Sequence, residues 1–140
     1  MPTLSIGILT LNEERRIAGC LRSAAFADEV VVVDSGSTDR TVELARSMGA
    51  KVHVHADWQG FAVQRNRLLA HSQCDYIFFL DADEEITAEL QVQLCEAVAS
   101  GRNAVWRIQW CIVAFGRELT HFRSRTAVER LFRRDALTAF

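Results

Sequence analysis

The sequence predicts an α/β domain in which helices cover both faces of a mainly parallel sheet. Short apolar runs alternate along the chain with stretches whose apolar residues recur at helical spacing. The run 30–33 is four consecutive valines, as expected for a strand buried on both faces of a parallel sheet. Strands that alternate with helices favour parallel pairing. Because the 140 residues contain no repeat and no Gly/Ser linker, we expect a single domain over 1–140.

The first half of the chain contains signals for three strands and three helices. Asn12 is expected to cap the first helix, in which Ile17, Cys20, Leu21 and Ala24 form one apolar stripe. Gly49 is a natural stop for the second helix. The expected elements in order are a strand at 4–10, a helix after Asn12, a strand at 30–34, a helix from the turn 35–39 to about Met48, a strand at 51–55 and a helix at 60–71.

The second half begins with a strand at 75–81, which includes the apolar run 76–80. A fourth helix is expected from the spacing of Ile86, Leu90, Leu94 and Val98. Residues 104–115 and 128–133 are predicted to form further strands. These elements complete the alternating pattern.

Four acidic residues lie within five positions directly after the strand at 75–81. They are Asp81, Asp83, Glu84 and Glu85. If the chain is still extended there, Asp81 and Asp83 point to one side and could face one divalent cation. Oxygen ligands suit Mg²⁺ or Mn²⁺, and Mg²⁺ usually takes one or two carboxylates together with substrate phosphates. The alternative is an acidic loop that starts the next helix, and we expect this role for Glu84 and Glu85.

Polar segments follow three of the predicted strands. They are Thr10-Leu11-Asn12-Glu13, Asp34-Ser35-Gly36-Ser37 and Asp81-Ala82-Asp83. Ligands of open α/β sheets bind beyond the carboxyl ends of the strands. We therefore expect these segments to meet at one rim and to form a ligand site.

Charge and composition narrow the classes of function. The net charge of −2 conceals a basic C-terminal third, in which eight arginines between 102 and 134 face only two acids. These arginines either bind an anionic partner or pair locally. Since no nucleic-acid-binding signature accompanies them, nucleic acid is not an expected partner.

Cysteine and histidine positions suggest no strong metal site. The four widely spaced cysteines are interpreted as small core residues of a protein in a reducing compartment. His53 and His55 alternate with valines and should share one face of a strand. A two-histidine metal site is conceivable there, but the sequence suggests no third ligand.

Taken together, the motifs resemble glycosyltransferase family 2, whose members have the GT-A fold, a Rossmann-type three-layer sandwich. The segments that carry the resemblance are Leu11-Asn12-Glu13-Glu14, Val31-Val32-Val33-Asp34-Ser35-Gly36-Ser37-Thr38-Asp39, Gln64-Arg65-Asn66, Asp81-Ala82-Asp83-Glu84 and Arg130-Leu131-Phe132-Arg133-Arg134. The combination is similar to the branch of bacterial lipopolysaccharide-core glycosyltransferases. The resemblance implies inverting transfer of a sugar from a nucleotide-diphospho-sugar to a glycolipid or saccharide acceptor, with Mg²⁺ or Mn²⁺ bound by a DxD motif.

The resemblance also assigns roles to individual residues. Asp83 would contact the metal directly, and Asp81 would contact the donor ribose or a metal-bound water. Arg65 would pair with a phosphate or, alternatively, with an acidic neighbour, whereas Asn66 would be structural. The remaining residues expected to line the nucleotide-sugar are Thr10, Leu11, Glu13, Asp34, Ser35 and Ala82.

The resemblance stops short of a complete enzyme. In this branch the general base would follow the strand at 128–133, beyond Phe140, so the chain resembles the nucleotide-binding portion of a longer, truncated transferase. The alternative is a non-catalytic nucleotide-sugar-binding or regulatory module that keeps the fold.

We expect a cytoplasmic protein, compatible with peripheral contact at the inner membrane, and a homodimer because apolar surface would be left exposed. A phospho-receiver or phosphotransferase fits poorly, since Lys51 is the only lysine.

Overall fold

A computed structural model of the chain describes residues 1–114, 116–118 and 127–140. Its centre is a six-stranded sheet in the order β3-β2-β1-β4-β8-β5. The strands are β1 (Leu4–Thr10), β2 (Glu29–Asp34), β3 (Lys51–Val54), β4 (Tyr76–Asp81), β5 (Val105–Ile108) and β8 (Val128–Arg133). The first four are parallel, and β8 runs antiparallel between β4 and β5. The predicted α/β sandwich with a mainly parallel sheet is confirmed.

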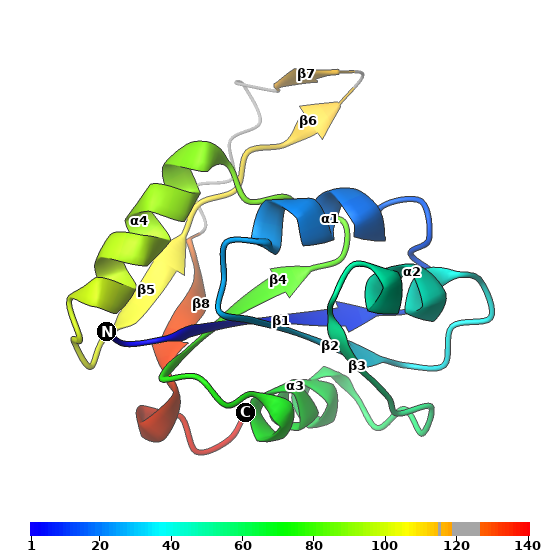
Figure 1. Ribbon diagram of the computed structural model, residues 1–140, viewed down its shortest axis with the longest axis horizontal. Helices are drawn as coiled ribbons and strands as arrows, with labels where there is room; N and C mark the ends of the chain where they lie inside the picture. The colour runs from blue at the N-terminus through cyan, green and yellow to red at the C-terminus, as the bar shows by residue number, and fades with distance from the viewer. Residues whose placement is uncertain (115, 119–126) are drawn as a thin grey trace.

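Helices cover both faces of this sheet (Figure 1). The helices α1 (Ile17–Ala24), α2 (Thr41–Ser47) and α4 (Ala88–Ala99) lie on one face, and α3 (Phe61–His71) lies on the other. Each face has its own apolar core. The predicted stripe of α1 packs on the first face with Leu94 and Val98, whereas Leu68 and Leu69 pack on the second against Val31 and Phe79.

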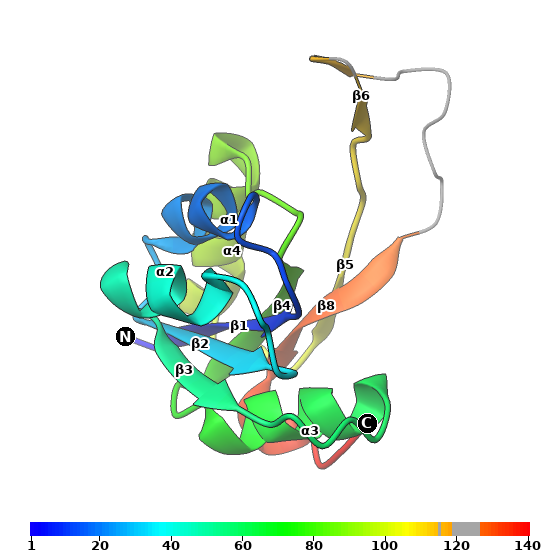
Figure 2. The same ribbon diagram turned by 90° about the vertical axis from the view of Figure 1, so that its right-hand side faces the viewer.

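The strand predicted at 4–10 coincides with β1, and the strands predicted at 30–34 and 51–55 each differ from β2 and β3 by one residue at one end. The predicted strand at 104–115 is wrong in part, because β5 ends at Ile108. Ile108 is opposite Val128, where the partner strand β8 begins. Further along, Val113–Ala114 and Arg117–Glu118 form a separate hairpin of β6 and β7, which stands away from the main sheet (Figure 2). Residue 115 lies outside the described residues.

Two of the four cysteines depart from the prediction that all are core residues. Cys20 is buried and Cys74 is half-buried, but Cys95 and Cys111 are exposed. Cys95 follows the buried Leu94 on α4 and therefore faces solvent. Within the part of the chain that the structure describes, none of the helices combines the length and the apolar composition that crossing a bilayer requires.

Candidate nucleotide-sugar site

The carboxyl ends of β1, β2 and β4 meet at one edge of the sheet, as predicted. The register sets Thr10 opposite Asp34, and Leu9 opposite Asp81. The Thr10 hydroxyl donates a 2.7 Å hydrogen bond to the Asp34 carboxylate. The strand register therefore brings together three segments that are far apart in the sequence.

Asp34 organises the second of these segments. Its buried carboxylate accepts hydrogen bonds from the Thr10 hydroxyl, the Gly36 N–H, and both the N–H and the hydroxyl of Ser37. Gly36 has φ +99, and a Cβ there would lie 3.2 Å from the Cβ of Ala56, so the turn requires glycine. Asp34 thus holds the loop, and its contact with a base or ribose stays a prediction.

The loops after β1 and β2 clamp each other through Asn12 and Glu13. The Asn12 N–H donates to the Ser37 hydroxyl, and the Asn12 side-chain oxygen accepts from the Thr38 N–H, both at 2.8 Å. The Glu13 N–H donates to the Thr41 hydroxyl at 2.8 Å. These bonds fix the relative positions of the two loops before any ligand arrives.

The prediction that Asn12 caps the first helix is wrong. The helix α1 begins at Ile17 with Arg16 at the N-cap position. Asn12 instead has φ +53, and it is the only residue other than glycine with positive φ among the described residues. Asparagine tolerates this left-handed conformation better than most residues, because its short polar side chain can bond locally. Its side chain therefore serves the neighbouring loop.

A second pair of contacts extends this clamp to the start of α2. The Glu14 N–H donates to the Asp39 carboxylate, and the Glu14 carboxylate accepts from the Arg40 N–H. Asp39 also accepts from the N–H and the hydroxyl of Thr41. These hydrogen bonds, led by the one from the Thr41 hydroxyl, lower the pKa of Asp39. Asp39 thus lies just before the helix α2 and bonds to its first residue.

Leu11 and Glu13 lie at this edge beside Thr10. The Leu11 side chain is exposed, and Glu13 is half-buried. Both are placed where a ligand at the rim could reach them. Ala82 is buried at the end of β4, so it supports the turn more than it offers contact surface.

Gln64 lies in a segment that carries the family resemblance, but the sequence alone predicted no role for it at the site. Its side chain is fully buried, and its amide donates to the Ser35 hydroxyl at 2.8 Å and to the His55 carbonyl at 3.2 Å. Its carbonyl accepts from Arg67, which also pairs with Asp57 at 2.7 Å. The spacing could have indicated that Gln64 is buried. Gln64 lies four positions before the buried Leu68, which places both on the inward face of α3.

Arg65 and Asn66 contact the C-terminal residue. The Arg65 guanidinium lies 5.7 Å from the centre of the Phe140 ring, and the Asn66 side chain accepts a 2.8 Å hydrogen bond from the Phe140 N–H. Phe140 packs edge-on against Phe79 and Phe132. The structural role expected for Asn66 fits this contact, and the phosphate contact of Arg65 stays a prediction.

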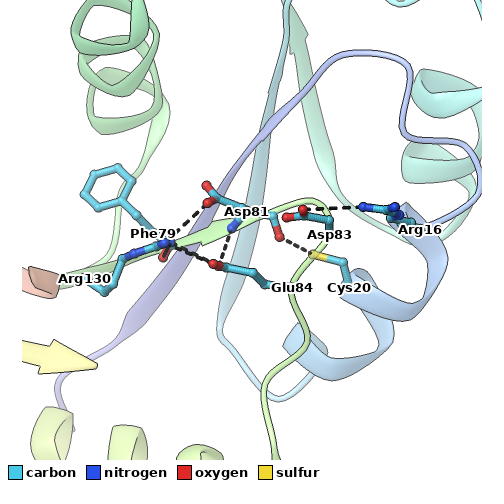
Figure 3. A network of polar contacts seen from close by, with 7 residues as sticks. All are labelled: Arg16, Cys20, Phe79, Asp81, Asp83, Glu84 and Arg130. Carbon is cyan, nitrogen blue, oxygen red and sulfur yellow. Dashed lines mark hydrogen bonds and ion pairs between the residues drawn. The ribbon is translucent and has the colours of Figure 1, made fainter. Parts of the chain in front are cut away.

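The acidic motif turns sharply after β4 (Figure 3). Asp81 is the last residue of the strand, and its carbonyl accepts a 2.9 Å hydrogen bond from the Glu84 N–H. The chain is therefore not extended here. The prediction that Asp81 and Asp83 point to one side depended on an extended chain, so its basis is absent. Asp83 pairs with Arg16 at 3.5 Å, whereas Asp81 pairs with Arg130 at 3.3 Å.

The prediction that Glu84 and Glu85 start the next helix is wrong, because both lie before it. The helix α4 begins at Ala88, with the Thr87 hydroxyl as its N-cap acceptor. Glu84 lies in the preceding turn, where both of its carboxylate oxygens pair with Arg130 and one also accepts from the Asp81 N–H. Burial raises the pKa of Glu84, although its bonds to the Asp81 N–H and to Arg130 oppose this shift.

Two carboxylates of this turn remain accessible. The side chains of Asp81 and Asp83 are 52% and 50% exposed. They supply hard oxygen donors, and Asp83 is held by an exposed ion pair of the kind that contributes little stability. Across the described residues, no three His, Cys, Asp or Glu side chains are placed to hold a metal by themselves. The turn thus fits an Mg²⁺ or Mn²⁺ ion that takes further ligands from a bound diphosphate.

Three histidines gather on the α3 side of β3. The rings of His53 and His71 stack in parallel with centroids 3.6 Å apart, and the Nε2 atoms of His55 and His71 are 3.0 Å apart. The predicted common face of His53 and His55 is confirmed. His71 joins them from the end of α3, which the strand pattern alone could not indicate.

Three arginines of the C-terminal third pair with nearby acids where the structure describes them. Arg107 pairs with Glu129, and Arg133 pairs with Asp135. Arg130 is buried under the acidic turn. Arg123 and Arg125 lie outside the described residues. Local pairing, one of the two interpretations of this basic region, therefore accounts for Arg107, Arg130 and Arg133.

The comparisons with known proteins decide the family. The profile described as Glycosyl transferase family 2 matches residues 5–137. The chain belongs to this family. It is 33% identical over 138 residues to the lipopolysaccharide core biosynthesis glycosyltransferase LpsC of Rhizobium meliloti, which covers 94% of the chain and 51% of LpsC. It is also 44% identical to an uncharacterized glycosyltransferase of Rickettsia typhi over 97 residues, 67% of the chain and 32% of that protein.

Solved structures agree with this assignment. TarS of S. aureus superposes with a TM-score of 0.70 and 26% identity over 96% of the chain and 29% of TarS. Glucosyl-3-phosphoglycerate synthase from Mycobacterium tuberculosis, in complex with Mn²⁺, UDP-glucose and phosphoglyceric acid, superposes with a TM-score of 0.53 and 31% identity, over 58% of the chain and 33% of the enzyme. The GT-A-like fold is therefore confirmed. The chain spans about a third of the length of the rickettsial relatives and half of LpsC.

Proposed function

We propose that this family 2 chain binds the donor of a metal-dependent inverting glycosyltransferase, which transfers a sugar from a nucleotide-diphospho-sugar to a glycolipid or saccharide acceptor. The observation that carries the proposal is the position of the two half-exposed carboxylates Asp81 and Asp83 at the end of β4, beside the clamped loops of β1 and β2. The Mycobacterium enzyme, similar in fold and sequence, binds Mn²⁺ and UDP-glucose. The likeness to LpsC supports a lipopolysaccharide-core acceptor.

Each site residue has a role in this proposal. Asp83 holds the metal, and Asp81 holds the ribose or a metal-bound water. A divalent ion bound there would neutralise negative charge on the departing nucleoside diphosphate. Arg65 binds a phosphate through its planar fork. The residues that line the base, the ribose and the sugar are Thr10, Leu11, Glu13, Asp34 and Ser35, and the buried Ala82 contributes by supporting the turn beside them.

The clamp between the two loops supports selective binding of the donor. Because Asp34, Asn12 and Gln64 already hold the loops in place, less conformational freedom is lost when the nucleotide binds.

We place the protein in the cytoplasm at the inner face of the membrane, where a glycolipid acceptor is available, and we propose that it is a homodimer. Sedimentation at micromolar concentration tests the dimer, and a single monomeric species would exclude it.

Calorimetric titration tests the function directly. UDP-, GDP- and ADP-sugars are titrated into the protein with Mn²⁺ and, separately, with EDTA. We expect one nucleotide class to bind with Mn²⁺ and to bind at least about tenfold more weakly without it. Asp83→Ala should abolish the dependence on metal, whereas Glu96→Ala, which removes an exposed carboxylate of α4, should preserve it. Absence of metal-dependent binding in the wild-type protein would contradict the proposal.

A second assay separates a transferase from a binding module. Release of the nucleoside diphosphate is followed with and without a lipopolysaccharide-core acceptor. Acceptor-dependent release supports transfer. Tight binding without release would instead support a non-catalytic nucleotide-sugar-binding module.

A further inference from the structure

Arg130 is a buried cation directly beneath the acidic turn. It lies on β8 and is only 4% exposed. One terminal nitrogen donates to the Phe79 carbonyl at 2.9 Å and to Glu84 at 3.1 Å, and the other donates to Glu84 at 3.1 Å and to Asp81 at 3.3 Å. Figure 3 shows these bonds converging from the strand onto the turn. Both terminal nitrogens of the guanidinium are therefore engaged.

The geometry requires the shape of arginine as well as its charge. The two terminal nitrogens form a fork with the two oxygens of Glu84. A lysine ammonium is a single point and cannot make this two-pronged contact. The Trp110 ring lies 5.1 Å from the guanidinium carbon. The Arg130 Nε is buried and lacks a hydrogen-bond partner among the described residues. The hydrogen bonds of the guanidinium are therefore made by its two terminal nitrogens.

Glu84 transmits this contact to the metal-binding part of the turn. Its carboxylate accepts from the Asp81 N–H at 3.0 Å, while its own N–H donates to the Asp81 carbonyl at 2.9 Å. Asp83 lies inside the turn that these two bonds close. Holding Glu84 therefore fixes the backbone that carries both Asp81 and Asp83.

We infer that Arg130 is a positioning residue for the metal–diphosphate site, which acts through the Glu84 fork to hold Asp81 and Asp83 for the cation. This inference rests on the proposed function. Arg130 also offsets repulsion between the clustered carboxylates, because a cation next to two anions lowers the energy of holding them together. It contacts Oδ2 of Asp81, and the carboxylate as a whole stays half-exposed.

The same contacts would be seen if the ion pair only stabilised the fold. The experiment must therefore measure the affinity for metal separately from the stability of the protein. Mn²⁺ is titrated by water proton relaxation, in the presence of whichever of UDP, GDP or ADP binds the wild-type protein best. The variants are Arg130→Lys, which keeps the charge without the fork, Glu84→Gln, and the two combined. Arg133→Lys on the same strand is the matched control, because Arg133 pairs with Asp135 and lies opposite Tyr76 at the start of β4, away from the acidic turn. Thermal unfolding shows that each variant is folded.

We expect Arg130→Lys and Glu84→Gln each to weaken Mn²⁺ binding by about tenfold, and the double variant to weaken it no further, because both substitutions break the same fork. Arg133→Lys should bind Mn²⁺ like the wild-type protein. If folded Arg130→Lys binds Mn²⁺ as tightly as the wild-type protein, the inference is overturned and the contact is purely structural. If the losses multiply to about a hundredfold, Arg130 does not act through Glu84, and the inference fails as well.

The outcomes also separate this inference from the proposed function. Wild-type protein that shows no metal-dependent nucleotide binding overturns both. Wild-type protein that binds normally, together with variants that bind equally well, overturns only the role of Arg130.

Discussion

The Asn12 side chain accepts a 2.8 Å hydrogen bond from the backbone N–H of Thr38, which joins two loops that are 26 residues apart in the sequence. Asn12 makes this bond at φ +53, so one residue supplies both an unusual backbone conformation and the acceptor. The first loop of the site is therefore held by the second.

Substitution of Asn12 should separate these two contributions. Asn12→Gly loses the acceptor but keeps the backbone conformation, and we expect it to lower the free energy of unfolding by about 1 kcal/mol. Asn12→Ala should lower it by about 1 kcal/mol more, because alanine is strained at positive φ. Urea unfolding measures both, with the exposed Asn103→Ala as a control that should change little. Equal stability of the glycine and alanine variants would contradict this account.

His71 should make stability depend on pH near neutrality. Burial, together with the charges of His53 and His55, lowers the pKa of His71. Below its ordinary pKa of about 6.5, the unfolded chain binds a proton that the folded protein resists, so the free energy of unfolding falls as the pH drops. We expect a smaller fall between about pH 7.5 and 5.5 in His71→Asn than in the wild-type protein.

Chemical denaturation at several pH values measures this difference. Carboxylates also titrate in the acidic part of the range, but they do so in both proteins, and the comparison largely cancels them. Parallel curves for the wild-type protein and His71→Asn would contradict the contribution of His71 to the pH dependence.

Cys20 should be unreactive in the folded protein. Burial, with a smaller contribution from Glu84 and the neighbouring acids, raises the pKa of the Cys20 thiol to about 12. Since the thiolate is the reactive form, iodoacetamide at about pH 8 should modify the exposed Cys95 and leave Cys20 intact. Peptide mass spectrometry locates the label, and the same reaction in urea should modify both. Labelling of Cys20 as fast as Cys95 without urea would be inconsistent with the buried position.

The sequence was a good guide wherever local periodicity decides the structure. The valine run 30–33 and the stripe of Ile17, Cys20 and Leu21 predicted a central strand and a helix face, because burial on a sheet dictates those patterns. Polar segments after strands predicted the rim, since parallel strands end at one edge. These inferences depend only on neighbours in the chain and on the general form of the fold.

Contacts between distant segments could not be predicted in the same way. Asn12 has the chemistry of a helix cap and also that of a left-handed loop residue, and only the presence of Thr38 decides between them. Gln64 reaches Ser35 because α3 packs over the end of β2. Likewise, Glu84 has the pattern of a helix start, and its pairing with Arg130 depends on β8 lying beside β4. In each case the deciding partner is set by topology.

The insertion of β8 between β4 and β5 also has a consequence for how the chain folds. Arg130 is 49 residues later in the chain than Asp81, so ribosomal synthesis completes the acidic turn well before its counter-charge exists. Until β8 docks, β4 is the edge of the nascent sheet, and its turn carries clustered negative charge without Arg130. Long-range pairing of this kind slows folding, because loop-closure entropy is lost before the contacts form. The corner of the sheet with the acidic turn should therefore be among the last parts of this domain to reach its native arrangement.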